Sequence, residues 1–455
     1  MKVVVVGGGF AGLAAAIRLQ ERRHDVVLLE RRGVLGGRAT SSRDAVTGDE
    51  VDNGTHLMIG AYSATLELLR RAGAEELLLI QPDLKLEWVD ERGRAVLACP
   101  PLAAPLHLLA GLAGLRAPLA VKLQAIRLGL AVRFGRRPDG LTLAEYLKRT
   151  GQGEEARRLV WDPLAIAILN EPVERAAAVL FHRVYQEAFL RDHRASRLVF
   201  PRRGWGVLME RLGGYFESRG GRLCRGARAE GLVVRNGRVT GVKYLQRSEK
   251  REEIAGGKPP ERRLERADAV VSAVPPPALL DLLPEELRAH PAFEALERFQ
   301  ASPIVAVDLW LDRVVVDRLM LGLRDAEMEW VFDKGRLHGR DGTPQHLAFI
   351  VSAAYRSAPK TNAELVEAAV AALQRYFPAM AGASLTRSLV QREAQATFAS
   401  TPELEALRPG PVSDAPGLFL AGDWTDTGLP ATIEGAVRSG LRAAQAVCSA
   451  APDGA

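Results

Sequence analysis

The sequence predicts an α/β fold, and three observations near its two ends indicate it. Residues 3–6 are four valines, which is typical of a parallel strand that is buried on both faces. A glycine-rich turn and an alanine-rich helix, expected over residues 11–21, follow directly. Near the other end, the apolar residues 417–421 lead into another glycine, and a further helix begins about ten residues later. Strands that feed helices through glycine turns predict a Rossmann-like parallel sheet.

The first glycine-rich turn predicts a dinucleotide site. Gly7, Gly9 and Gly12 have the G-x-G-x-x-G spacing, which allows a tight turn, close approach of the backbone to a pyrophosphate, and close packing of helix on strand. The amides and dipole at the N-terminus of the next helix would hold the two phosphates. A second strand, expected over 25–29, ends at Glu30, whose carboxylate can accept hydrogen bonds from ribose hydroxyls.

A second glycine pair narrows the kind of dinucleotide. Arg31 is followed by Gly36, Gly37 and Arg38, so two glycines that let a ligand approach the backbone stand beside an arginine that can bind a phosphate. This extension resembles the FAD enzymes of the flavin amine oxidase and phytoene desaturase superfamily rather than the NAD dehydrogenases. The resemblance implies a Rossmann-like FAD-binding domain of the glutathione reductase type, with a discontinuous α+β substrate domain.

Composition excludes several classes of protein. The 455 residues predict two or three domains, and 47% hydrophobic with 25% charged residues is typical of a globular chain. A net charge of +6 is too small and too scattered to indicate a nucleic-acid partner, but it is compatible with an anionic cofactor and an anionic membrane surface. The three distant cysteines, Cys99, Cys224 and Cys448, form neither a metal spacing nor a disulfide framework. We therefore expect no metal and a reducing cytoplasm.

The middle of the chain predicts a helical unit. Residues 94–116 contain a charge-free stretch long enough to span a membrane, but its prolines and glycines argue against a spanning helix. The next helix combines an apolar surface with basic residues, the pattern of a helix in a membrane interface. A pair of helices covering a buried substrate tunnel explains the same pattern, and both interpretations hold if the tunnel opens toward lipid. Helices are expected over residues 63–73, 117–134, 141–149, 154–169 and 176–189, with Thr142 as the N-cap of the third.

Alternating strands dominate the second half of the chain. Asn236-Gly237 predicts a tight hairpin turn, and residues 246–266 are dense in charge and predict a solvated loop. A second sheet, with one face lining a pocket, is expected from the later strands. Strands are expected over residues 222–225, 229–234, 238–245, 267–274, 293–311, 330–332, 346–354 and 385–393, with helices over 207–219 and 363–377. The predicted domain segments are 1–76, 199–290 and 397–455 for FAD binding, and 77–198 (helical, facing the membrane) and 291–396 (sheet) for the substrate.

Three internal stretches narrow the resemblance to one family. They are Asp52-Asn53-Gly54-Thr55-His56-Leu57, Trp161-Asp162-Pro163-Leu164 through Asn170, and Thr397-Phe398-Ala399 with Gly422 to Gly435. With these motifs the chain resembles the hydroxysqualene dehydroxylases, the squalene-associated FAD enzymes of bacterial hopanoid pathways. It departs from that pattern in three places: Thr55 replaces a usual glutamine, residues 392–395 lack an expected lysine, and residues 201–206 look more like a general carotenoid-type desaturase.

The resemblance implies non-covalent binding of FAD by both ends of the chain. The helix N-terminus at Thr432 would stabilise negative charge on the reduced flavin ring, and the backbone at Ala229 would meet the adenine. The residues expected to contact FAD are Gly7, Gly9, Phe10, Ala11, Gly12, Glu30, Arg31, Gly36, Gly37, Arg38, Gly54, Thr55, His56, Leu57, Ala229, Val274, Gly422, Asp423, Ala431, Thr432 and Ile433.

The resemblance also implies a reaction: hydroxysqualene loses water and gains hydride, giving squalene. Departure of the hydroxyl group requires a proton donor. His56, expected beside the flavin ring, is the candidate catalytic residue, as general acid or water-positioning group, and a water held by Asp52 or Trp424 is the alternative. Taken alone, the stretch around His56 is better explained by a strand followed by a turn, with His56 as a satisfied buried polar group. Trp161, Asn170 and Trp424 are candidate substrate contacts in a long apolar pocket.

Three other functions compete with this one. A carotenoid or phytoene-type desaturase would use the same cofactor oxidatively. An amine oxidase commonly places a tyrosine at the position of Thr432 and often binds FAD through a cysteine, and this sequence has neither feature. A flavin-binding scaffold that passes isoprenoids between membrane enzymes is the non-enzymatic alternative. Because the sequence shows no second nucleotide fingerprint, we expect an external electron donor, and we expect the protein in the cytoplasm at the inner face of the membrane.

Overall fold

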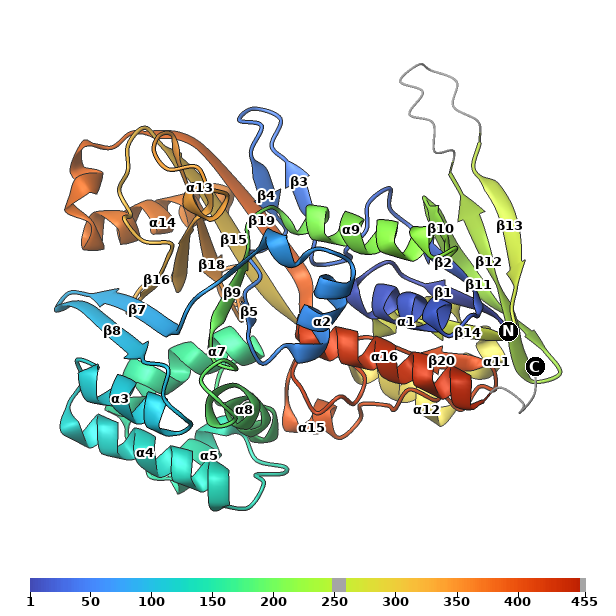
Figure 1. Ribbon diagram of the computed structural model, residues 1–455, viewed down its shortest axis with the longest axis horizontal. Helices are drawn as coiled ribbons and strands as arrows, with labels where there is room; N and C mark the ends of the chain where they lie inside the picture. The colour runs from blue at the N-terminus through green and yellow to red at the C-terminus, as the bar shows by residue number, and fades with distance from the viewer. Residues whose placement is uncertain (248–258, 451–455) are drawn as a thin grey trace.

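The computed structural model describes residues 1–247 and 259–450, and its centre is a five-stranded parallel sheet (Figure 1). The strand order is β10-β2-β1-β14-β20, and all four pairings are parallel. Its strands are β1 (Lys2–Val6), β2 (Asp25–Glu30), β10 (Arg222–Arg225), β14 (Ala269–Ser272) and β20 (Leu418–Leu420). The sheet thus combines four segments that are far apart in the sequence.

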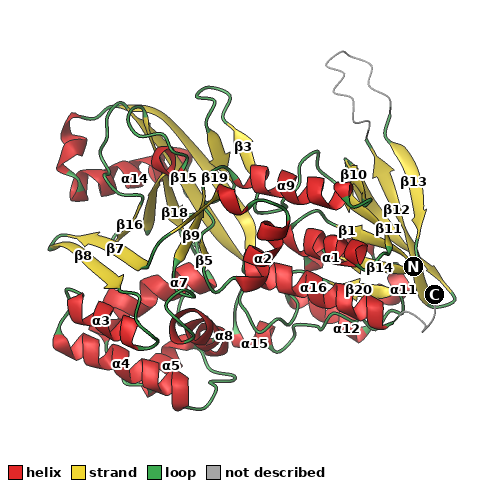
Figure 2. Ribbon diagram, in the orientation of Figure 1, coloured by secondary structure: helices red, strands yellow, loops and turns green. Residues whose placement is uncertain are grey.

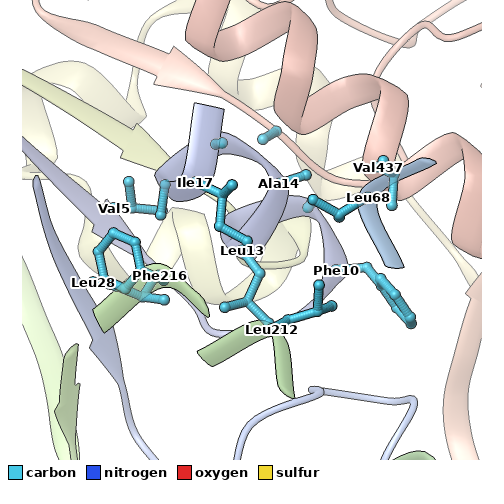
Figure 3. Packing of buried hydrophobic residues seen from close by; sticks show 14 of the residues in the cluster. Val5, Phe10, Leu13, Ala14, Ile17, Leu28, Leu68, Leu212, Phe216 and Val437 are labelled. Atoms are coloured by element: carbon cyan, nitrogen blue, oxygen red, sulfur yellow. The ribbon is translucent and has the colours of Figure 1, made fainter. Parts of the chain in front are cut away.

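The valines of β1 are buried on both faces, as their pattern predicts. Val3 and Val5 pack against a layer of four helices, whereas Val4 and Val6 pack against the three-stranded antiparallel sheet. Figure 3 shows the helical side, where Leu13 of α1 lies between Val5 and Leu212. The helices are α1 (Phe10–Glu21), α2 (Ser63–Arg71), α9 (Trp205–Ser218) and α16 (Ile433–Ser449), and the antiparallel strands are β11 (Ala227–Arg235), β12 (Arg238–Gln246) and β13 (Glu261–Arg266).

A second sheet of seven strands, in the order β19-β15-β18-β17-β16-β7-β8, lies beside the first (Figure 1). Side chains of β15 alternate between its faces: Val305 and Val307 pack against the helix α14 (Asn362–Tyr376), and Ile304 and Ala306 pack on the opposite face. The strands are β7 (Leu84–Asp90), β8 (Gly93–Cys99), β15 (Ala301–Leu311), β16 (Met320–Leu323), β17 (Trp330–Asp333), β18 (Gln345–Val351) and β19 (Leu385–Phe398).

A layer of helices lies next to this sheet (Figure 2). Thr142 caps α5 in a full capping box with Glu145, as the sequence predicts at that position. Among the described residues, no helix is long and apolar enough to cross a membrane. The layer contains α3 (Leu106–Gly114), α4 (Leu119–Phe134), α5 (Leu143–Arg149), α6 (Glu154–Ala156), α7 (Asp162–Leu169) and α8 (Ala178–Tyr185), with π-helical turns at Arg157–Trp161 and Gln186–Leu190.

Short elements connect these layers. A hairpin pairs β3 with β4, and a small sheet has the order β5-β9-β6. The short strands are β3 (Ser41–Arg43), β4 (Glu50–Asp52), β5 (Met58–Ile59), β6 (Leu78–Ile80) and β9 (Leu198–Pro201). The short helices are α10 (Pro276–Leu282), α11 (Glu285–Arg288), α12 (Pro291–Glu294), α13 (Lys334–Leu337) and α15 (Pro402–Glu405), with 3-10 turns at Glu75–Leu77, Ala295–Arg298 and Pro378–Gly382.

Three expectations from the sequence are wrong. Residues 78–99 form β6, β7 and β8 rather than part of a helical segment, because β7 pairs with the distant β16 and joins the second sheet. The strand expected from residue 293 begins at Ala301, after helical turns. Part of the expected loop forms β13, an edge strand whose side chains are mostly exposed and so give no apolar alternation; residues 248–258 of that loop lie outside the described residues. The domain boundaries stay predictions.

Candidate functional site

The turn between β1 and α1 forms an open cradle with the second glycine pair, and we call Gly9, Gly36 and Gly37 the glycine cradle. A Cβ added to Gly9 would lie 3.8 Å from the carbonyl oxygen of Gly36 and 4.0 Å from Cα of Gly37, so the space beside Gly9 is free of close contacts. Gly9 is the N-cap of α1, and no described side chain accepts from the first amides of this helix. Uncapped amides at a helix N-terminus suit an anionic group such as a pyrophosphate.

Gly12 of the same motif has a packing role. A Cβ at Gly12 would lie 1.8 Å from the carbonyl oxygen of Gly7, so only glycine lets α1 approach the turn this closely. Gly7 itself has a φ of +107°, a conformation that side chains rarely adopt. Phe10 and Ala11 are buried in the first turn of α1. The three glycines therefore act as the motif predicts, with Gly9 alone facing open space.

Glu30 lies at the carboxyl end of β2 and is 5% exposed. Its Oε2 accepts a hydrogen bond from the amide of Gly8 at 2.7 Å, and its Oε1 accepts one from the amide of Arg32 at 2.8 Å. These bonds fix the carboxylate, and each oxygen keeps a lone pair for a ribose hydroxyl. The Arg31 side chain is exposed.

Arg38 and Asp423 join the two ends of the chain at this site. A guanidinium nitrogen of Arg38 lies 2.7 Å from Oδ1 of Asp423, and another donates to the carbonyl of Ala396 at 2.9 Å. Burial works against a charged guanidinium, yet the Asp423 carboxylate outweighs it and raises the pKa of Arg38. Gly422 precedes this aspartate with a φ of +140°, and a Cβ there would lie 2.4 Å from Nε1 of Trp424. The turn therefore requires glycine.

The N-terminus of α16 lies in the same C-terminal segment. The Thr432 side chain caps the helix by accepting from the amide of Gly435 at 3.0 Å, and Ala431 and Ile433 flank it. Glu434 is 1% exposed and accepts from both the amide and the hydroxyl of Thr65, which fixes α16 against the start of α2. This orients the helix dipole rigidly.

A cavity separates these turns from the seven-stranded sheet. Four residues that the sequence predicts as flavin contacts meet in its wall, and five further residues complete it. The lining consists of Arg38, Gly54, Thr55 and His56 from the predicted set, with Asn53, Ile304, Ile350, Glu393 and Ala396. The sequence did not indicate Ile304, Ile350, Glu393 and Ala396, because β15, β18 and β19 reach the site through long-range pairing. Asn53 follows β4 and belongs to the motif around His56, but it was not among the predicted contacts.

His56 lies in this wall with a defined orientation. Its Nε2 is 3.4 Å from the carbonyl oxygen of Arg38, and its ring packs edge-on against Trp205 with centroids 6.0 Å apart. Because a carbonyl only accepts, Nε2 carries the hydrogen, and Nδ1 of the neutral ring is an acceptor. Burial lowers the pKa of His56, and the nearby Asp52 carboxylate only partly opposes this effect. The imidazole is therefore neutral at pH 7.

Glu393 places a carboxylate in the cavity, in the segment where the family resemblance leads one to expect a lysine. Its Oε2 accepts from Nδ2 of Asn53 at 2.9 Å, and its strand position pairs with Ile304. Glu393 and His56 are two of the polar side chains in this wall that can contact a hydroxyl group.

Three predicted substrate contacts lie elsewhere and have other partners. Trp161 is buried among helices and donates to Gln152 at 2.8 Å. Asn170 ends α7 in a left-handed conformation and donates to Thr397 at 2.9 Å. Trp424 donates its indole N–H to the carbonyl of Val274 at 3.0 Å. This N–H is therefore already bonded and does not hold the water considered above as a proton donor. Their roles toward a substrate stay predictions.

The remaining predicted cofactor residues are spread around the first sheet. Ala229 lies in β11 beside a bulge, Val274 follows β14, and Leu57 packs at the edge of the apolar cluster on the inner face of the second sheet. The open glycine cradle, the fixed Glu30 carboxylate and the Arg38–Asp423 pair together fit FAD, which needs sites for a pyrophosphate, a ribose and a flavin.

Comparison with known proteins decides the family. Residues 10–448 match the model of the flavin-containing amine oxidoreductases. The chain belongs to this family. As a flavin-containing amine oxidoreductase, the protein is an FAD-dependent oxidoreductase, which confirms the predicted cofactor and class of enzyme.

Curated relatives cover nearly the whole chain. The hydroxysqualene dehydroxylase of Rhodopseudomonas palustris is 31% identical over 98% of both chains. The 15-cis-phytoene desaturase of Synechococcus elongatus is 26% identical over 98% of this chain and 96% of its own. The crystal structure of an oxidoreductase from Methanosarcina mazei superposes with a TM-score of 0.73 at 17% identity, covering 99% of this chain and all of that one, which confirms the α/β fold.

Proposed function

We propose that the protein converts hydroxysqualene to squalene, for hopanoid or related triterpene synthesis. The observation that carries this proposal is the 31% identity to a hydroxysqualene dehydroxylase across 98% of both chains. Bound FAD, reduced by a donor outside the chain, supplies the hydride. The allylic C–O bond breaks, its oxygen leaves as water after taking one proton, and the carbon receives the hydride, so that atoms and charge balance.

The turns at both ends of the chain hold FAD in this proposal. The glycine cradle and the uncapped start of α1 bind the pyrophosphate, and Glu30 binds the ribose. Arg38 and Asp423 fix the turns against each other, and the dipole of α16 faces the flavin. The proposal includes non-covalent binding, and the absence of a cysteine between Cys224 and Cys448 argues against a cysteine linkage at the C-terminal turn. Acid precipitation should release the flavin intact, and a retained yellow pellet would contradict this.

His56 acts on the leaving hydroxyl group. The Nε2 hydrogen of His56 is donated to the backbone carbonyl of Arg38, so Nδ1 is free to accept a hydrogen bond from the hydroxyl group or from a water. This bond fixes the orientation of the group that donates it. Ile304 and Ile350 on the opposite wall exclude water and contact hydrocarbon. Beyond them the same sheet face continues with Ala306, Trp330 and Phe332, which suits a long isoprenoid that binds through buried apolar area.

A membrane surface supplies this substrate. On α4, Val121, Ala125, Leu128 and Val132 face the protein interior, whereas an opposite stripe of large apolar side chains is open to solvent. This stripe consists of Leu119, Leu123, Leu130 and Phe134, which are 70%, 57%, 55% and 75% exposed. Basic side chains at 127, 133, 136 and 137 are exposed around it, so the surface matches an anionic bilayer at the inner face of the membrane.

A vesicle-binding assay tests the membrane surface. Replacing Leu119, Leu123, Leu130 and Phe134 with serine should reduce co-sedimentation with anionic phospholipid vesicles at least tenfold, because the replaced apolar area drives insertion. The buried face of α4 is unchanged in this variant, so its unfolding temperature should stay that of the wild type. Undiminished binding would contradict the assignment of this face to lipid.

Product analysis tests the reaction. Purified protein, FAD, a chemical reductant and hydroxysqualene should yield squalene, detected by gas chromatography and mass spectrometry. Absence of squalene while the flavin stays reduced would contradict the proposal. The 26% identity to a phytoene desaturase makes desaturation the second candidate; phytoene incubated with oxidised enzyme and a quinone acceptor would then give a product with more double bonds.

A further inference from the structure

A buried lysine that follows the seven-stranded sheet pairs with the β3–β4 hairpin beside the cavity. Lys334 begins α13 and is 1% exposed, and its ammonium group lies 2.5 Å from Oδ2 of Asp52 at the end of β4. Asp52 is 4% exposed. Taking both charges out of water costs several kcal/mol each, and apolar residues in such places are often equally stable. Stability alone therefore does not explain this ion pair.

The second oxygen of Asp52 leads from this ion pair to His56. Oδ1 accepts from the hydroxyl of Ser41 at 2.6 Å and from the amide of Trp205 at 3.3 Å. The Trp205 ring then packs edge-on against His56. Lys334 thus holds Asp52, Asp52 holds the start of α9, and the first side chain of α9 bounds the imidazole.

We propose that Lys334 is a positioning residue that acts through Asp52 on the orientation and charge state of His56. The inference rests on the proposed function, since that function gives His56 its role. Lys334 is not among the residues that line the cavity, and it directly follows β17 of the second sheet. It therefore connects the sheet proposed to bind the hydrocarbon with the residue proposed to contact the hydroxyl group.

The charges around His56 support this role. Burial lowers its pKa most strongly; the Asp52 carboxylate raises it, and Arg38 and Lys334 lower it further. From the neighbouring elements, Glu393 of β19 lines the same cavity. The same ion pair acts on His338 of the α13 region: burial and Lys334 lower the pKa of His338, and Asp52 raises it. Removing Lys334 leaves the Asp52 carboxylate to raise the pKa of His56 without an opposing lysine. Removing both charges leaves Arg38 as the cation that still lowers it.

Two variants with opposite expected signs test the inference. In K334M, Ser41 and Trp205 still hold the Asp52 carboxylate, and the pKa of His56 should rise, because a cation that lowers it is removed. In D52N/K334M, where neither charge remains, it should fall below the wild-type value. The measurement is an NMR titration of histidine-labelled, full-length protein with FAD bound, with H56Q used to assign the resonance. An unchanged His56 titration in both variants, or shifts of the same sign, would overturn the proposal.

A matched control and a second readout complete the experiment. Lys360 pairs with Glu327 at 2.7 Å in the same domain, and K360M should leave the His56 titration unchanged. K334M leaves the Asp52 carboxylate buried without its cation and so can fail to fold. In that case the neutral double variant alone decides, through the downward shift in the pKa of His56. The titration requires no turnover, so a wild-type protein that makes no squalene would refute the proposed function and leave this test intact.

Discussion

Gly9 and Gly12 stand three residues apart in one turn, and the atoms around them give them different roles. Gly9 has no contact closer than 3.8 Å for an added Cβ, whereas Gly12 would bring a Cβ to 1.8 Å from a carbonyl oxygen. The first glycine therefore leaves room for a ligand, and the second leaves room for the helix. The order of the glycines in the motif predicts this division of roles.

Alanine substitutions should separate the two roles. G9A should fold with nearly wild-type stability but bind FAD at least tenfold more weakly, because its methyl group fills the glycine cradle. G12A should lose about 3 kcal/mol or more of unfolding free energy, since the clash is with backbone. Chemical denaturation of the apoproteins and flavin fluorescence titration measure the two effects. Equal stability loss in both variants would show that the cradle also serves packing.

The lowered pKa of His56 makes a prediction about pH. If the neutral imidazole positions the hydroxyl group, turnover should be constant above its ordinary value of about 6.5 and should decline at some lower pH, as the ring becomes protonated. H56A should lower kcat by about 100-fold with little effect on KM. Steady-state rates from about pH 5 to pH 8 measure this dependence. A rate that rises toward acid would instead assign the imidazolium as the proton donor.

At the scale of elements, Arg408 organises the C-terminal flavin turn. Its guanidinium is buried beside α15, donates to the carbonyls of Asp423 and Thr425, and pairs with Glu405 at 2.6 Å. The residue gives no signal in the sequence, because an arginine before a proline in a loop is expected to be exposed. Arg408 meets its partners only in the folded protein, because β20 places the turn at the edge of the first sheet.

Replacing Arg408 with methionine should lower the unfolding free energy by about 3 kcal/mol, since the buried Glu405 and two carbonyls lose their donor. FAD affinity should fall with it, because the turn that carries Asp423 loses its support. Arg442 is the matched control: it is exposed and donates to the carbonyl of Asp426 at 2.6 Å, so R442M should cost less than about 1 kcal/mol. Thermal unfolding of both variants checks the difference.

Elements with strong local signals were predictable. The buried valines of β1, the Asn236-Gly237 turn and the Thr142 cap each depend on residues within one or two turns of chain, and each forms as predicted. The strands β7 and β13 were not, because β7 depends on pairing with a strand more than 200 residues away and β13 exposes most of its side chains. β7 is mostly buried, but its burial comes from a distant partner strand, whereas the exposed side chains of β13 give no apolar alternation.

At the scale of the whole molecule, ion pairs between distant segments were the least predictable feature. Asp52 and Lys334 are 282 residues apart, and Arg38 and Asp423 are 385 apart. Motifs in the sequence mark Arg38, Asp52 and Asp423, but nothing in the local sequence indicates which distant side chain each one pairs with. The cavity could be predicted in part, because His56 and Gly54 belong to a motif, whereas Glu393 could not.

Buried histidines make stability of the whole molecule depend on pH. Burial, with Lys334 nearby, lowers the pKa of His338 to about 4, so below about 6.5 the unfolded chain binds protons that the folded protein does not. Stability is therefore complete above that pH and is lost as pH falls toward 4. Burial also lowers the pKa of four other histidines, His24, His56, His107 and His182.

From about pH 7.5 to about pH 5, His338 alone should cost about 2 kcal/mol of unfolding free energy. H338Q should therefore show a shallower decline over this range than the wild type. Urea denaturation at several pH values measures the two slopes. Parallel slopes would mean that His338 is protonated as easily in the folded protein as in the unfolded chain.

The order of strands in the first sheet has a consequence for synthesis of the chain. β14 needs β20 as its outer neighbour, and β20 leaves the ribosome nearly 400 residues after β2. At about 5–20 residues per second, synthesis of this stretch takes roughly 20–80 s. During that time the growing sheet has an unpaired apolar edge, first on β1 until β14 is made and then on β14 until β20 is made. Asp423 emerges later still. FAD can therefore be enclosed from both ends only by a completed chain, and chaperones have the whole interval in which to bind the nascent one.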